Sequence, residues 1–105
     1  MIIPRDAIIA EEKIRDYLLK PLAVDDKSGY FAIAGYTREE YWELLRDIRD
    51  QLLPAEAAFQ KRQEFRDFYQ LQGKLKGPNG KEIGVRSIWT VDPAQTIRFI
   101  SMFPD

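Results

Sequence analysis

The sequence predicts an α+β fold, in which N-terminal helices pack on one face of a C-terminal antiparallel sheet. Apolar residues recur at helical spacing in the first half of the chain and alternate with a period of two in the last third. The alternating runs are separated by short segments that contain Gly or Pro, as in a β-meander. With 105 residues, the chain has the length of one domain, 1–105.

Two short helices are predicted first, after a short extended piece at residues 7–9. Glu11–Leu19 carries apolar residues on one helical face, and Pro21 ends this helix because proline cannot donate a backbone hydrogen bond. Asp26–Ala34 is predicted as the second helix. Gly35 follows it and suits a C-terminal cap.

The strongest helix signal begins at Thr37, which has Glu40 three residues later in the pattern of a capping box. Pro54 either ends this helix or restarts the chain as a further helical turn over Ala55–Gln63. The predicted buried stripe of the helix is Tyr41, Leu44, Leu45, Ile48 and Leu52.

Three alternating runs follow, at residues 68–75, 81–91 and 95–103. The turn Gly77–Gly80 and the break at Asp92–Pro93 separate them, so we expect a three-stranded meander, to which a short N-terminal strand would add. Because successive side chains of a strand point to opposite faces, the odd-numbered residues are expected to cover the helices.

The odd-numbered face is predicted to hold Trp89 as a core anchor, with Ser87 and Ser101 as buried hydroxyls bonded to backbone. The even-numbered face is mixed. Its apolar members indicate that the N-terminal segment, a partner subunit or a ligand covers part of this face, unless a β-bulge reverses the faces of one run. The polar members are Gln70, Gln72, Lys74, Arg86, Thr90, Thr96 and Arg98, and the apolar members are Phe68, Ile88, Ile100 and Met102.

Composition excludes several kinds of chemistry. The chain contains no cysteine and no histidine, so thiolate chemistry, disulfides and imidazole catalysis are absent. No pattern indicates a metal site, a cofactor or a membrane segment, and we expect a cytoplasmic protein. Residues 1–60 carry a net charge of −4 and residues 61–105 carry +3, so an anion would meet the C-terminal part.

Several segments, read in order, carry a resemblance: Lys13, Tyr17–Leu19, Lys27 with Phe31, Gly35–Tyr36, Gly77–Gly80, Val85–Trp89 and Phe99–Pro104. Together they resemble a bacterial family catalogued as domain of unknown function 6883. The layout of such domains is similar to that of the barnase–EndoU–colicin–RelE group of ribonucleases and toxins, in which RNA lies on the sheet. Where that family tends to have basic or polar residues before Lys27, this chain has Asp25 and Asp26.

Two hypotheses of different classes remain open. The first is a protein-interaction domain, a homodimer or a partner of another protein, whose interface is Phe68, Ile88, Ile100 and Met102. The second, implied by the resemblance, is a ribonuclease-like or RNA-binding domain of toxin type. In that reading Arg86 and Arg98 would stabilise the phosphorane in metal-independent cleavage. The expected RNA- or anion-binding residues are Gln70, Gln72, Lys74 and Lys27. The alternative for Lys27 is capping or surface pairing with Asp25 or Asp26.

Overall fold

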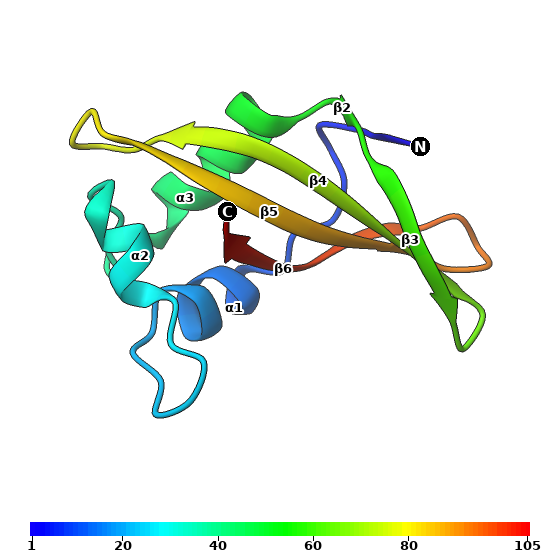
Figure 1. Ribbon diagram of the computed structural model, residues 1–105, viewed down its shortest axis with the longest axis horizontal. Helices are drawn as coiled ribbons and strands as arrows, with labels where there is room; N and C mark the ends of the chain where they lie inside the picture. Colours follow the sequence, from blue (N-terminus) through cyan, green and yellow to red (C-terminus); the bar gives the residue numbers. More distant parts are fainter.

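The computed structural model describes residues 1–105 and shows helices gathered beside one half of a long, twisted sheet (Figure 1). This is the α+β fold that the sequence predicts. The elements in chain order are β1 (Ile2–Ile3), α1 (Glu11–Lys13), η1 (Ile14–Leu18), α2 (Ser28–Ile33), α3 (Tyr41–Asp47), η2 (Ile48–Leu52), β2 (Ala55–Glu56), β3 (Ala58–Gln63), β4 (Arg66–Lys76), β5 (Glu82–Val91) and β6 (Ile97–Pro104), where η denotes a π-helical turn that continues the preceding helix.

The helices form close to where the sequence places them. The first prediction is met by α1 and η1 together, and α2 lies within the second predicted helix. Gly35 adopts a φ of 92°, as expected for the residue that ends α2. α3 begins at Tyr41 with Glu40 as its N-cap residue, so Thr37 is not the N-cap that the sequence predicts. The hydroxyl of Thr37 accepts a hydrogen bond from the backbone N–H of Glu40, 3.3 Å away, in the turn before the helix. Leu44 and Ile48 of the predicted stripe are fully buried.

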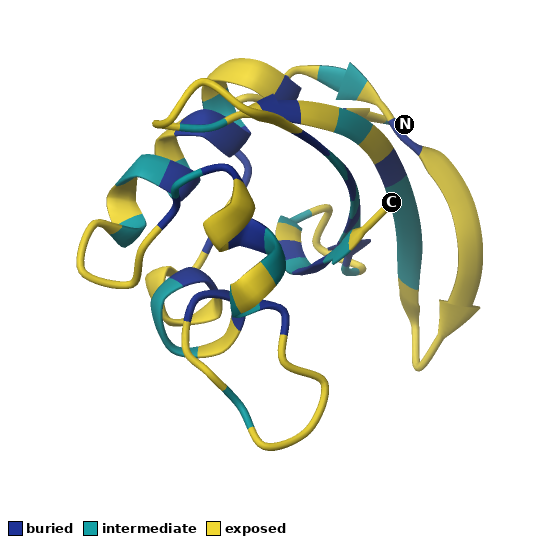
Figure 2. Cartoon of the chain, turned by 60° about the vertical axis from the view of Figure 1, so that its left-hand side comes forward, coloured by how far each residue is buried: buried dark blue, intermediate teal, exposed yellow.

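The main sheet has four strands rather than three, in the order β3-β4-β5-β6, and every neighbouring pair is antiparallel. Of the two alternatives for Pro54, the helix ends before it, at Leu52. The other alternative, a further helical turn over Ala55–Gln63, was wrong, because this segment forms β2 and β3. All six residues of β3 are exposed on both faces (Figure 2), so the strand carries no alternation that sequence reasoning can detect. The extended conformation of β3 comes from its pairing with β4.

The N-terminal segment also joins the strands. β1 pairs with β2 in a separate two-stranded sheet. Ile8 makes a single parallel bridge to Arg98 at the free edge of β6, so residues 7–9 are extended as predicted.

A β-bulge in β6 changes which of its residues meet the core. Ile88 of β5 lies opposite Ser101, whereas the next residue, Trp89, lies opposite Phe99, and Ile100 is therefore the extra residue. Beyond this point the faces of β6 are reversed. Met102 lies opposite Ser87 on the core face and is fully buried. Its predicted place on the other face was wrong.

The core lies between the helices and the odd-numbered face of β5. Trp89 is fully buried, as predicted, and its ring packs edge-on against Phe99 with 5.4 Å between the ring centroids. The indole N–H donates to the hydroxyl of Ser87, 2.9 Å away, and that hydroxyl donates to the carbonyl of Leu71, 3.0 Å away. This chain of bonds satisfies the indole N–H of Trp89 and the hydroxyl of Ser87, and it fixes the tryptophan ring.

Candidate nucleic-acid interface

The face of the sheet opposite the core is a broad polar surface, which we call the polar sheet face. Residues directly opposite each other in antiparallel strands point to the same face, so the strand pairing defines its members. Across the strands the rows are Lys61–Phe68–Thr90–Arg98, Gln70–Ile88–Ser101 and Gln72–Arg86–Phe103, with Lys74 beside Gly84 at the end. The polar residues that the sequence assigned to this face therefore lie on it, with two exceptions. Thr96 precedes β6 and belongs to no strand, and Thr90 is buried, with 1% of the residue exposed.

The basic side chains of the polar sheet face are mostly free of carboxylate partners. Lys74 lies 3.8 Å from Glu82, in an exposed pair. Lys61, Arg86 and Arg98 have no carboxylate oxygen within 4.0 Å. A strand surface whose cations lack internal partners keeps an attractive potential for anions.

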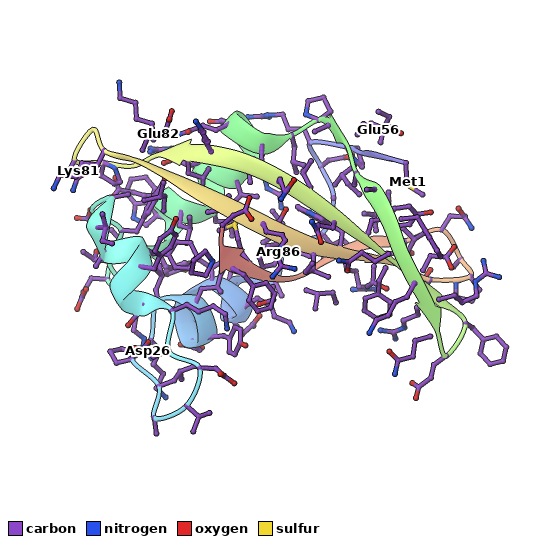
Figure 3. The ribbon with its side chains drawn as sticks, viewed as in Figure 1. Met1, Asp26, Glu56, Lys81, Glu82 and Arg86 are labelled. Atoms are coloured by element: carbon purple, nitrogen blue, oxygen red, sulfur yellow. The ribbon has the colours of Figure 1, made fainter.

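Aromatic rings lie among these cations. The ammonium of Lys61 is 5.3 Å from the centroid of the Phe68 ring, and the guanidinium of Arg86 is 5.0 Å from that of Phe103. Figure 3 shows Arg86 near the middle of the molecule, on β5. Neither Lys61 nor Phe103 was among the predicted site residues. Lys61 lies in the segment mistaken for a helix, and Phe103 reaches this face only because of the bulge at Ile100.

Arg86 and Arg98 share the polar sheet face but do not converge. Arg98 lies opposite Thr90, which is four residues from Arg86 along β5. Four residues of a strand span about 13 Å, which is more than one phosphate group covers. The two guanidinium groups are therefore placed to contact different parts of a long ligand.

The apolar part of the polar sheet face is smaller than the sequence predicts. Phe68, Ile88 and Ile100 are half-buried, and Met102 belongs to the core. Ser101 is only 7% exposed, but its hydroxyl has no hydrogen-bond partner, so the predicted bond to backbone is not formed.

Lys27 lies at the end of this face and not on the open surface. Its side chain is buried, and its ammonium donates to the Tyr17 hydroxyl at 3.1 Å and to the backbone carbonyl of Asp25 at 3.4 Å. The predicted surface pairing with the carboxylate of Asp25 or Asp26 was wrong. Asp26 instead accepts hydrogen bonds from the backbone N–H and hydroxyl of Ser28, and the hydroxyl bond, the larger effect, lowers the pKa of Asp26.

None of the surface hollows is lined by Arg86, Arg98 or Lys27. The largest, about 430 Å³, lies beside α2 and is lined in part by Leu19 and Tyr36. Because small-molecule sites are concave, a flat face with separated cations suits an extended polymer better.

The helices of this chain are too short and too polar for any of them to span a membrane.

Comparison with known proteins identifies a family and a fold. The family described as "Domain of unknown function (DUF6883)" has a sequence model that matches residues 4–105. No curated protein matches the chain. Among solved structures, the chain is similar to one in "Contact-dependent growth inhibition toxin - immunity protein complex from Klebsiella pneumoniae 342". That chain is 14% identical with a TM-score of 0.62, and the match covers 94% of this chain and 100% of that one. At this identity, the likeness concerns the fold.

Proposed function

We propose that this chain, which belongs to the DUF6883 family, binds single-stranded RNA on its polar sheet face. The observation that carries the proposal is the set of strand cations without carboxylate partners, namely Lys61, Arg86 and Arg98. Neutralising phosphates and releasing their counterions supplies much of the affinity for nucleic acids. Cations already paired with protein carboxylates would contribute less.

A single strand fits this face better than a duplex. Proteins that bind single strands combine a basic surface with aromatic or apolar side chains on which unstacked bases lie. Phe68 and Phe103 lie beside Lys61 and Arg86, and Ile88 is half-buried between these two rows. Gln70 and Gln72 offer amide groups along the same track. The polar sheet face thus alternates places for bases with places for phosphates.

The layout resembles that of ribonucleases of the barnase–EndoU–colicin–RelE group, so cleavage of bound RNA is the activity to measure together with binding. Arg86 and Arg98 supply positive charge of the kind that stabilises a phosphorane. Their separation assigns each to a different phosphate. Glu82, at the edge of the face, is already paired with Lys74.

The test is the affinity of the protein for a labelled single-stranded RNA oligonucleotide, measured by fluorescence anisotropy at several salt concentrations. Contacts to three phosphates predict a slope of log K against log salt of about −2. Arg86→Gln and Arg98→Gln should each make the slope less negative by about 0.7. Salt-independent affinity, or no binding by the wild-type protein, would refute the proposal.

A second candidate is a protein-binding domain or homodimer. The patch of Phe68, Ile88 and Ile100 on the same face favours it, as does the similar structure, which belongs to a toxin–immunity protein complex. The edge strand β3 is a poorer interface, because Lys61, Arg62 and a bulge after Phe59 hinder pairing with another strand. Light scattering separates the alternatives: a dimer that Ile88→Asp dissociates would support the second, and a monomeric wild-type protein removes the homodimer.

A further inference from the structure

Lys27 is a buried cation whose bonding capacity is not fully used. Its side chain is among the few charged ones in the interior, with 8% of the residue exposed. Lysine is seldom buried unless it is paired with an acid. No carboxylate lies within 4.0 Å of this ammonium, and its two acceptors are the Tyr17 hydroxyl and a carbonyl oxygen. Because an ammonium has three N–H groups, one N–H of Lys27 has no protein acceptor.

Two aromatic rings enclose this ammonium and link it to a second cation. Its nitrogen lies 4.7 Å from the centroid of the Tyr17 ring and 4.9 Å from that of Phe103. The guanidinium of Arg86 lies 5.0 Å from the same Phe103 ring. Both distances are measured to the centroid of the Phe103 ring, so the ammonium of Lys27 and the guanidinium of Arg86 are separated by at most the sum of these two distances. Ring faces attract cations, but a ring carries no net charge to neutralise them.

The nearby acidic residues make no ion pair within 4.0 Å of either cation. The carboxylate of Asp26 is engaged by Ser28 at the start of α2, 2.7 Å from its hydroxyl and 3.0 Å from its backbone N–H. It keeps its negative charge: the bonds from Ser28 are the larger causes that lower the pKa of Asp26, and the charge of Lys27 is a smaller one. Asp25 contributes its carbonyl oxygen, not its side chain, to Lys27. A phosphate can therefore approach Lys27 without displacing a carboxylate from it.

We propose that Tyr17, Lys27 and Arg86 form a binding site for one phosphate group at the end of the polar sheet face. The Tyr17 hydroxyl accepts from Lys27, so its own proton is free to donate to a phosphate oxygen. The two cations supply charge-assisted hydrogen bonds, the strongest kind for this ligand. The proposal rests on the RNA-binding function and assigns this site to a backbone phosphodiester of the bound strand.

The test compares Lys27→Met, Tyr17→Phe and the control Lys81→Met. Methionine preserves much of the volume of lysine without its charge, and phenylalanine removes only the hydroxyl. Lys81 precedes β5 at the far tip of the β4–β5 hairpin (Figure 3), away from Arg86. The assays are anisotropy with a labelled single-stranded RNA oligonucleotide at several salt concentrations, and the melting temperature with and without inorganic phosphate.

Lys27→Met should weaken RNA binding about tenfold and change the salt slope by less than about 0.7, because Arg86 still contacts the same phosphate. Tyr17→Phe should weaken binding without changing the slope, and Lys81→Met should match the wild type. Inorganic phosphate should raise the melting temperature of the wild type more than that of Lys27→Met. Folded Lys27→Met with wild-type affinity and slope would overturn the site, as would unaltered binding by Tyr17→Phe if Lys27→Met fails to fold.

The two proposals fail in different ways. If the wild type binds RNA and folded Lys27→Met binds it with the same affinity, the phosphate site is refuted and the RNA-binding face is retained. If the wild type does not bind RNA, but inorganic phosphate raises its melting temperature and not that of Lys27→Met, the RNA-binding function is refuted and the phosphate site is retained.

Discussion

Gly77 is the position where a single methyl group should disturb the contact between the sheet and the helices. The β4–β5 turn rests against the end of α2 (Figure 1). The backbone N–H of Asn79 donates to the carbonyl of Ala34 at 3.3 Å, and its side-chain amide donates to the carbonyl of Ile33 at 2.9 Å. A Cβ at Gly77 would overlap the carbonyl oxygen of Ala34 and lie 2.5 Å from its Cβ. The turn in Gly77→Ala must therefore move away from α2.

The expected loss of stability follows from these contacts. Two hydrogen bonds to α2 are lost, at about 1 kcal/mol each. Residual overlap against backbone, which cannot rotate aside, adds about 1 kcal/mol at the low end of overpacking costs. The total is about 3 kcal/mol, which corresponds to a fall in melting temperature of roughly 12–24 °C for a domain of this size.

Urea unfolding followed by circular dichroism measures this effect, with Gly73→Ala as the matched control. A Cβ at Gly73 would meet only Leu52, 2.6 Å from the end of its flexible side chain, so the cost should stay below about 1.5 kcal/mol. If Gly77→Ala is no more destabilising than Gly73→Ala, the turn does not hold α2 and the reasoning is refuted.

Three further predictions concern the core and the surface. Tyr36→Phe removes the 2.6 Å bond to the buried carboxylate of Asp47 and should cost about 1–3 kcal/mol in urea unfolding; unchanged stability would contradict this role. Met102→Ala should cost about 2–5 kcal/mol by the same assay, whereas a neutral result would place Met102 outside the core. The hydrogen bond from Arg15, ahead of that from Arg38, lowers the pKa of Asp16 from 3.8 to about 2. Its contribution is present above pH 4 and lost as pH falls through 2, so the stability difference between the wild type and Asp16→Asn should shrink over that range; a difference independent of pH would argue against the ion pair.

The alternation of β5 predicted its two faces from Glu82 to Trp89. β5 is paired on both sides, so its odd-numbered residues are held against the helices and its even-numbered residues away from them. Thr90 departs from this pattern, because it is even-numbered and yet buried. The same logic located Arg86 and Arg98 on one face. It succeeded because burial on one side of a sheet strongly specifies register.

The failures have local physical causes. The bulge at Ile100 is a backbone feature without a distinctive residue, yet it exchanges the faces of Met102 and Phe103. β3 is exposed on both faces and shows no period to read. The burial of Lys27 depends on Tyr17 and Phe103 meeting from opposite ends of the chain, which no spacing within a segment reveals.

The side-chain Nε–H resonances of Arg86 and Arg98 test the central claim most directly, by NMR during titration of the ¹⁵N-labelled protein with a single-stranded RNA oligonucleotide. RNA binding on the polar sheet face predicts that both resonances shift as the RNA binds, while those of Arg46 and Arg49 in the α3 and η2 helices stay in place. Saturation of the protein with RNA while the Arg86 and Arg98 signals remain unmoved would contradict it.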